Sequence, residues 1–316
     1  MDHRKLHHVG LIRLRAPSPY LRHPVPVTIW YPTAAPEEAR REGIYDLSAA
    51  YDAPPTPGSY GLVVISHGSG GSDINHHDWA EALARAGYVV AAPRHIGDSH
   101  DVNHGIGSRE QLLQRPRQLK AALEAALGHE TLRECIDPER IGVLGFSAGG
   151  YTSMVLLGAR PDFSRWGGYC KKHPESAVVC PIGKTLNLPK PTPEDWDGVY
   201  EPRIRAAVLL APFAMLFDAE NIAKIKTSVR LYRAENESIA RNPSNADSVA
   251  QNLPGHPEVV TVEGDHYVFI APVEDSLARK YHEFYIDAPG VNRRAIHERL
   301  AGEIIDFYDR KLGCPP

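Results

Sequence analysis

A serine lies between glycines in the sequence Gly-Phe-Ser-Ala-Gly at residues 145–149. The apolar run 140–144 before it predicts a buried strand, and residues 150–157 after it predict a helix. A serine on a sharp strand-to-helix turn presents its hydroxyl to a substrate, and the following backbone amide is free to bind an oxyanion. The pattern indicates that Ser147 is a nucleophile and that the Ala148 amide binds an oxyanion, although an ordinary glycine-rich turn has the same composition.

A serine hydroxyl attacks efficiently when an imidazole accepts its proton and a carboxylate fixes the tautomer of that imidazole. His266 follows the predicted strand 258–262 in a turn, which favours it as the base over a histidine that lies in a loop by chance. The acid is expected just after the strand that precedes this one, and Glu237 is the preferred candidate. The alternatives for the acid are Glu235 and Asp247.

A second oxyanion donor is expected from a glycine-rich turn that follows an earlier strand. The turn at residues 67–71 comes after the apolar run 62–66, and the amide of Ser69 is the predicted donor. The residues expected to contact substrate flank these groups, and they are His67, Gly68, Phe146 and Tyr267. Packing is the alternative role for Phe146.

Strands alternate with helices along the chain, which predicts a mostly parallel, doubly wound α/β sheet. The predicted strands are 25–32, 62–66, 88–93, 140–144, 204–210, 229–232 and 258–262, and the predicted helices are 79–86, 111–127, 150–157 and 294–312.

The proline-rich segment 160–205 is longer than an ordinary connection and cannot be a central element. We predict that it is an insert that forms a cap over the site within a single domain, residues 1–316. Its aromatic residues are expected to line a substrate pocket or to form a small core of the cap. They are Trp166, Tyr169, Trp196 and Tyr200.

The chain has 316 residues, a net charge of −4 and 42% hydrophobic residues, which is typical of a soluble globular protein. No segment is dense in Lys and Arg, so a nucleic-acid partner is not expected and a small molecule is. No apolar run approaches the roughly 18 residues of a membrane span. Residues 1–6 lack the apolar stretch of a signal peptide, which predicts a cytoplasmic protein, or a periplasmic or secreted one if a leader was removed. The oligomeric state stays open.

Four cysteines are too few for a disulfide framework in a chain of this length. Cys170 and Cys180 could form a disulfide, which would indicate an oxidising compartment, or could be two reduced thiols. Histidines are dense between His67 and His104, but they lack the spacing of a common metal motif, so neither a metal nor a cofactor is expected. His95 is expected near the mouth of the site.

Five motifs in order resemble the α/β-hydrolase superfamily, and more closely its bacterial branch of dienelactone hydrolases related to platelet-activating-factor acetylhydrolases. They are Ile-Trp-Tyr-Pro at 29–32, Ile-Ser-His-Gly-Ser-Gly-Gly at 65–71, Val-Val-Ala-Ala-Pro at 89–93, Gly-Phe-Ser-Ala-Gly-Gly at 145–150 and Gly-Asp-His-Tyr-Val-Phe at 264–269. The resemblance covers nearly the whole chain and implies a Ser, acid, His order of catalytic residues.

The chain departs from these relatives at two places. Dienelactone hydrolases proper use cysteine where this chain has Ser147. The acetylhydrolase branch places its acid after the strand at 204–210, where residues 210–213 contain no carboxylate. The second departure directs the assignment to Glu237, a glutamate where aspartate is more usual.

Together these residues predict a serine hydrolase that cleaves small or medium carboxylic esters through an acyl-enzyme. A lactonase, amidase or acyltransferase would use the same groups, because all of them attack an acyl carbonyl. A catalytically inactive hydrolase fold that binds a ligand is the alternative from another class.

Overall fold

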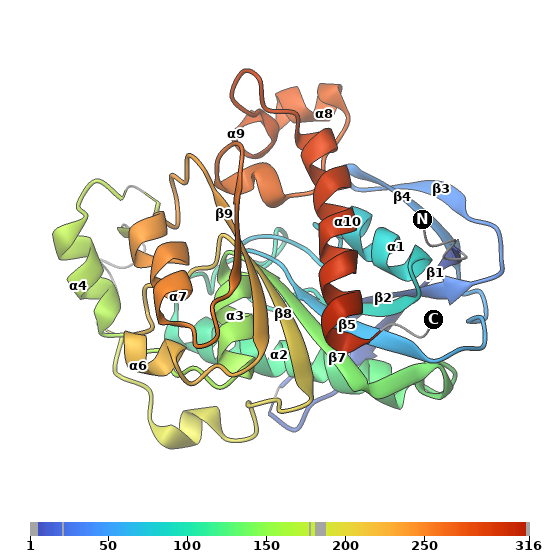
Figure 1. The fold of residues 1–316 in the computed structure, drawn as a ribbon, viewed down its shortest axis with the longest axis horizontal. Helices are drawn as coiled ribbons and strands as arrows, with labels where there is room; N and C mark the ends of the chain where they lie inside the picture. Colours follow the sequence, from blue (N-terminus) through green and yellow to red (C-terminus); the bar gives the residue numbers. More distant parts are fainter. Residues whose placement is uncertain (1–5, 21, 177, 181–187, 314–316) are drawn as a thin grey trace.

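The computed structural model describes residues 6–20, 22–176, 178–180 and 188–313. Within these residues, ten strands form one sheet in the order β10-β9-β8-β7-β5-β6-β2-β1-β4-β3 (Figure 1). The strands are β1 (His8–Ala16), β2 (Val25–Thr33), β3 (Glu38–Glu42), β4 (Tyr45–Tyr51), β5 (Tyr60–Ser66), β6 (Tyr88–Pro93), β7 (Ile136–Phe146), β8 (Ile204–Leu210), β9 (Ser228–Ala234) and β10 (Glu258–Val262).

The sheet is parallel from β6 through β5, β7, β8 and β9 to β10. The strands β2 and β1 continue it in antiparallel pairing, and β3 and β4 form a hairpin at its far edge. The strands β5 and β8 and residues 141–146 of β7 are mainly apolar and almost wholly buried, as strands covered on both faces must be. The prediction of a mostly parallel α/β sheet is therefore confirmed.

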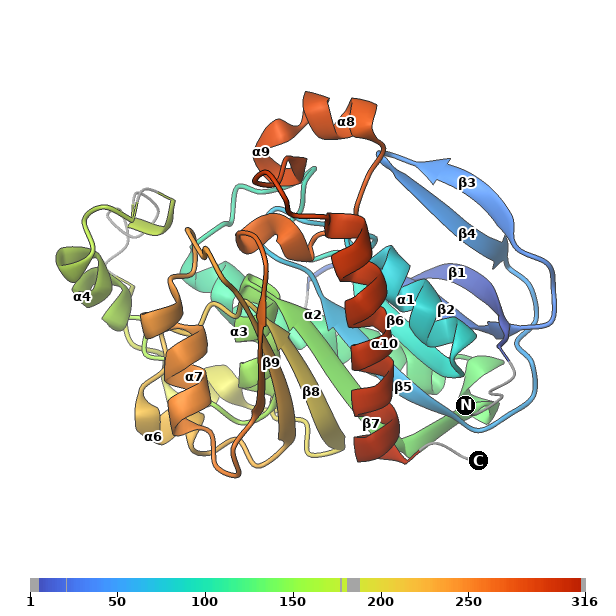
Figure 2. The same ribbon diagram turned by 45° about the horizontal axis from the view of Figure 1, so that its top comes forward.

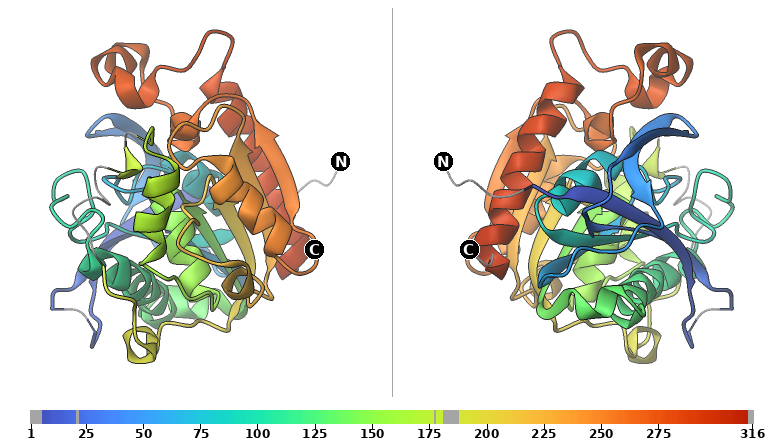
Figure 3. Two further views of the ribbon diagram at one scale, coloured as in Figure 1. Left: turned by 90° about the vertical axis from the view of Figure 1, so that its left-hand side faces the viewer. Right: turned by 90° about the vertical axis from the view of Figure 1, so that its right-hand side faces the viewer.

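Helices cover both faces of the sheet, and each face has its own hydrophobic core (Figure 3). The helices are α1 (His77–Arg85), α2 (Arg109–Gly128), α3 (Ala148–Leu156), α4 (Arg165–Lys172), α6 (Ala219–Ile222), α7 (Ala246–Asn252), α8 (Asp275–Lys280), α9 (His282–Tyr285) and α10 (Arg293–Leu312). One core packs α1 and α10 against the sheet, and the other packs α2 and α3 against the opposite face. Single 3₁₀ turns are η1 (Leu132–Glu134), η2 (Pro193–Trp196), η3 (Asn242–Ser244) and η4 (His266–Phe269).

The segment 160–205 leaves the sheet after α3 and returns to it at β8. Its helix α4 lies at one end of the molecule, and the β3–β4 hairpin lies at the other (Figure 2). Further along, η2 packs against α2, where Arg117 donates a 3.0 Å hydrogen bond to the carbonyl of Asp195. Trp196 is buried beside Phe163 and Arg160, so this part of the insert extends the core on the α2 and α3 face of the sheet. The placement of the segment agrees with an insert, and its role as a cap stays a prediction.

Candidate active site

Ser147 occupies a sharp turn between β7 and α3, with φ of 53° and ψ of −116°. The flanking glycines allow the turn because a Cβ on Gly145 would lie 2.2 Å from the Gly149 carbonyl oxygen. A Cβ on Gly149 would lie 1.8 Å from the Ser66 carbonyl oxygen, at the end of β5. The turn is therefore packed directly against the neighbouring strand and cannot accept side chains at these two positions.

The backbone of Ser147 is also held by the chain that leaves β8. Its amide donates a 2.9 Å hydrogen bond to the carbonyl of Leu210, and its carbonyl accepts one of 2.9 Å from the amide of Phe213. These bonds hold the serine at the carboxyl ends of the parallel strands, where open α/β sheets bind their ligands.

The side chains of Ser147, His266 and Glu237 form a continuous hydrogen-bonded chain. The hydroxyl oxygen of Ser147 lies 2.9 Å from Nε2 of His266, and Nδ1 of His266 lies 2.9 Å from Oε2 of Glu237. The imidazole is only 2% exposed, and Phe146 packs on it with ring centroids 4.9 Å apart. This arrangement can take a proton from the serine hydroxyl and stabilise the imidazolium that results.

Glu237 is oriented by its own loop. Its Oε1 accepts hydrogen bonds from the amides of Ile239 and Ala240, at 3.0 and 2.8 Å. Of the alternative acids, Glu235 is exposed, and Asp247 is paired with Arg233 at 2.5 Å. The structure therefore brings Glu237 to the histidine and leaves both alternatives elsewhere.

Asp265 joins the loop of the histidine to the loop of the acid. Its Oδ1 accepts from the amide of Ser238 at 2.8 Å and from the amide of His266 at 2.6 Å. Its Oδ2 accepts from the hydroxyl of Ser238 at 2.6 Å. Asp265 thus links the backbone of His266 to Ser238, the residue that follows Glu237.

The turn at residues 67–71 is held by a buried ion pair between Asp98 and Arg115, 2.5 Å apart. Asp98 accepts from the amide of Gly70 at 2.9 Å and from the hydroxyl of Ser69 at 3.3 Å, and Arg115 donates to the carbonyl of His67. Burial lowers the pKa of Arg115, and Asp98 opposes that effect as its counter-ion. The ion pair therefore grips the turn on both sides of the Ser69 amide.

A cavity of about 90 Å³ opens beside Ser147, Ala148 and Ser69. Its wall is mostly apolar and contains no charged side chain among the described residues. Besides those three, the lining residues are Ile106, Gly107, Gln111, Leu112, Tyr151, Trp166, Val178, Val179, Phe213 and Ile239. An uncharged, apolar group attached to a reacting carbonyl would fit this wall.

Comparison with known proteins agrees with this geometry. Residues 48–177 match the model of the dienelactone hydrolase family. A cutinase of Thermobifida fusca (strain YX) is 30% identical over 167 residues, which cover 49% of this chain and 52% of the cutinase. Cutinase 1 of Thermobifida cellulosilytica is 29% identical over 154 residues, covering 46% and 55%. The chain has the α/β-hydrolase fold, which is the fold of that family. It spans about half the length of the curated relatives that it matches.

Two of the residues that we expected to contact substrate are buried away from the cavity. His67 is 1% exposed, its Nδ1 donates to the carbonyl of Gly68 at 2.6 Å, and its Nε2 accepts from the amide of His95 at 3.1 Å. Phe146 is 3% exposed and packs on the rings of His76, His266 and Phe269. The structure gives both residues packing roles, because their rings are enclosed by other parts of the protein.

The other two expected contacts lie beside the site without lining the cavity. A Cβ on Gly68 would lie 2.9 Å from the ring of Phe146 and 3.4 Å from the Cβ of Ser147, so this glycine permits close packing under the serine. Tyr267 packs on its neighbour His266 and on Phe284. The expectation that His95 lies at the mouth is wrong, because it is fully buried between Ser66 and Gln118.

The sequence reasoning did not single out Asp98, Arg115 or Asp265. Asp265 precedes the histidine directly, which was an available signal, whereas Asp98 and Arg115 lie on a loop and a helix that only the fold brings to the turn. Ile106 and Leu112 were missed for the same reason.

Within the described ranges, no three His, Cys, Asp or Glu side chains are grouped so as to hold a metal ion. None of the helices there has the length and apolar character that a bilayer crossing demands.

Proposed function

We propose that this protein is a serine hydrolase that cleaves carboxylic esters of small or medium size through an acyl-enzyme. The observation that carries the proposal is the unbroken chain of hydrogen bonds from Ser147 through His266 to Glu237, beside an apolar cavity. The match to the dienelactone hydrolase family and the similarity to cutinases support an ester-cleaving activity.

In the proposed mechanism, the Ser147 oxygen attacks the ester carbonyl while Nε2 of His266 takes the hydroxyl proton. Glu237 accepts a hydrogen bond from Nδ1–H of His266 and stays ionised. This bond fixes the tautomer of the imidazole and stabilises the imidazolium. The amides of Ser69 and Ala148 bind the oxyanion, and the loss of one such donor costs about 2.7–4 kcal/mol in known enzymes. His266 then protonates the leaving alcohol. In the second half of the reaction, His266 takes a proton from a water molecule that attacks the acyl-enzyme, and it returns that proton to Ser147 as the carboxylic acid leaves.

The two amides are free for this task. Neither Ser69 nor Ala148 donates its amide proton to a protein acceptor within the part of the chain that the structure describes. Both residues line the cavity that contains Ser147. An ester carbonyl oxygen between them would lie next to the attacking hydroxyl.

Labelling with a fluorophosphonate tests the nucleophile directly. We expect stoichiometric labelling of the wild type at Ser147 and none of Ser147→Ala. Ser248→Ala is the matched control, because this serine lies on α7, away from the cavity of Ser147, and should leave labelling unchanged. Folded wild-type protein that resists the probe would overturn the proposal.

Product analysis separates esters from the other acyl substrates. Matched ester, lactone and amide panels, with water or an alcohol as acceptor, would distinguish esterase, lactonase, amidase and acyltransferase activity.

We infer an oxidising compartment rather than the cytoplasm, because the disulfide between Cys170 and Cys180 is of a kind that persists outside reducing compartments.

A further inference from the structure

The insert supplies one wall of the cavity beside the nucleophile. Trp166 from α4 and Val178 and Val179 from the chain that follows it line this wall. Val179 is buried, whereas Val178 is 47% exposed and lies at the rim. The facing wall comes from Ile106 and from α2, at Leu112, which belong to the body of the fold.

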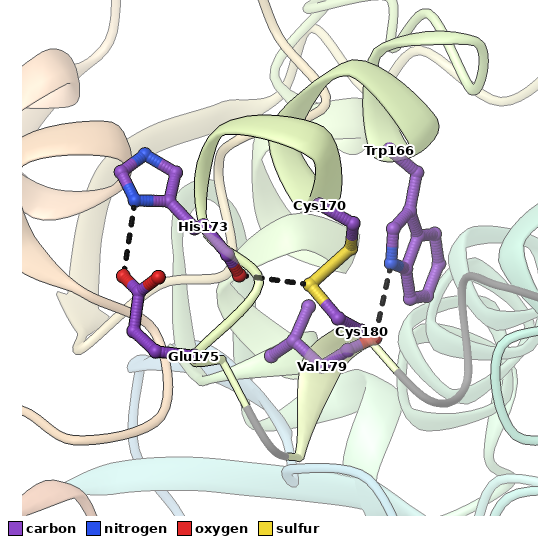
Figure 4. Close-up of a disulfide and its surroundings, with 6 residues drawn as sticks. All are labelled: Trp166, Cys170, His173, Glu175, Val179 and Cys180. Carbon is purple, nitrogen blue, oxygen red and sulfur yellow. Dashed lines mark hydrogen bonds and ion pairs between the residues drawn. A yellow bond between two sulfur atoms is a disulfide. The ribbon is translucent and has the colours of Figure 1, made fainter.

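The wall is braced by a covalent bond. Cys170 on α4 and Cys180 form a disulfide with their Cα atoms 5.4 Å apart (Figure 4). Cys180 directly follows Val179, so the bond fixes the lining residue to the helix that carries Trp166. We call the group Trp166, Cys170, Val178, Val179 and Cys180 the disulfide wall.

Noncovalent contacts complete the brace. The indole Nε1 of Trp166 donates a 3.2 Å hydrogen bond to the carbonyl of Val179 (Figure 4). The disulfide sulfur of Cys180, which has no proton to donate, lies in contact with the carbonyl oxygen of His173 at 3.5 Å. The indole also packs on Phe213, which follows β8 and lines the cavity too. The disulfide and the hydrogen bond from Trp166 to Val179 therefore hold the disulfide wall together internally. The wall packs on the body of the protein through contacts that include the ring pair of Trp166 and Phe213.

The short apolar segment 178–180 would sample more conformations without such a brace. A disulfide that closes a short loop reduces the number of these conformations. The effect is greatest for the residues next to the bonded cysteines, here Val178 and Val179. Because those side chains bound the cavity, its dimensions depend on the bond.

We propose that the disulfide wall determines which esters the enzyme accepts, by fixing the size limit for the uncharged apolar group bound beside Ser147. This inference rests on the proposed esterase function. The disulfide acts as a structural brace, and no electron transfer takes part in the reaction.

The test compares chain-length profiles of two cysteine variants. Kinetics on p-nitrophenyl acetate, butyrate and octanoate give the ratio of octanoate to acetate kcat/KM for each protein. We expect the double variant Cys170→Ala/Cys180→Ala to raise this ratio by about tenfold or more, since one methylene in an apolar pocket is worth at least that much. Cys135→Ala is the matched control, because it removes a buried free cysteine remote from the cavity and should leave the ratio unchanged.

A second pair of variants covers the case in which the double variant fails to fold. Val179→Ala keeps the disulfide and removes part of the wall, and it should raise the same ratio. Trp166→Phe keeps an aromatic ring and deletes the hydrogen bond to Val179, and it should shift the ratio in the same direction but less.

The outcomes separate this inference from the proposed function. If wild type labels with fluorophosphonate and cleaves acetate, but the folded double variant or Val179→Ala keeps the wild-type ratio, the inference is overturned and the esterase function stands. If wild type neither labels nor cleaves any of the three esters, the proposed function itself fails.

Discussion

At the scale of single residues, Glu237 is the choice that most needs a functional test, because two other carboxylates follow the same strand. Glu237→Gln should lower kcat by about 10⁴-fold, since an amide in place of the carboxylate favours the wrong imidazole tautomer. Glu235→Gln changes the same residue type two positions away on an exposed side chain, and we expect it to leave kcat within twofold, about the limit of a surface effect.

The measurement is steady-state kinetics on p-nitrophenyl acetate. A loss in Glu235→Gln as large as that in Glu237→Gln would mean that the hydrogen bond to Nδ1 does not identify the acid.

At the scale of elements, the turn between β7 and α3 depends on the close approach of Gly149 to β5. A Cβ at this position would clash with the backbone of Ser66. Ser66 lies on the central strand β5, so its backbone cannot shift to make room. Gly149→Ala should destabilise the protein by about 3 kcal/mol or more, at the upper end of overpacking effects.

Gly302→Ala provides the contrast, because no atom lies within 4 Å of a Cβ at that exposed position of α10. Helix propensity predicts a gain of about 0.5–1 kcal/mol there. Urea unfolding monitored by circular dichroism measures both changes, and equal effects of the two variants would contradict the steric explanation.

The elements that the sequence predicts best are those with the strongest apolar signal. The central strands β5, β6 and β8 lie within a residue or two of their predicted ranges because each is a continuous apolar run. The strand β3 was not predicted, since Glu-Ala-Arg-Arg-Glu has no apolar face and forms a strand by pairing with β4. The prediction also missed β1, β4 and the helix α4, whose paired glycines disfavour a helix in isolation.

The candidate site shows the same division. Ser147 and His266 follow strands in the expected chain order, so position along the sequence was enough to choose them as candidates. Position left Glu235 and Asp247 open beside Glu237, and only the folded structure shows which carboxylate meets Nδ1 of His266. The cavity wall and the Asp98–Arg115 ion pair depend on contacts between segments far apart in the chain, which local pattern does not encode.

At the scale of the whole molecule, buried histidines make stability depend on pH. Burial lowers the pKa of His76 to about 4, and burial together with the nearby Arg115 charge lowers the pKa values of His67 and His95 well below the ordinary range. These groups stay neutral in the folded protein, whereas in the unfolded chain they bind protons below a pH of about 6.5. Their contribution to the free energy of unfolding is therefore fully present above about 6.5 and is lost as the pH falls toward 4.

His76→Phe tests this contribution, because it keeps an aromatic ring beside Trp79 and Phe146 and removes the titrating group. Between pH 4.5 and 6, the stability of the variant should fall less steeply than that of wild type, by about 1.4 kcal/mol per pH unit. Urea unfolding at several pH values gives both slopes. His77→Phe should make the stability fall more steeply with decreasing pH, since Glu81 raises the pKa of His77 against the effect of burial. Parallel slopes for wild type and His76→Phe would rule out the buried neutral histidine as a source of the dependence.

The backbone of Ser147 is hydrogen-bonded to Leu210 and Phe213, where the chain leaves β8, and to the amides of Gly150 and Tyr151 on α3. None of these bonds comes from the described residues of the segment 160–205. The backbone of the nucleophile turn is thus held from outside this segment, which reaches it through the packing of Trp166 on Phe213. Natural variation, or a library randomised only at residues 165–180, can therefore change the acyl group that the cavity accepts while the backbone of the nucleophile turn stays the same.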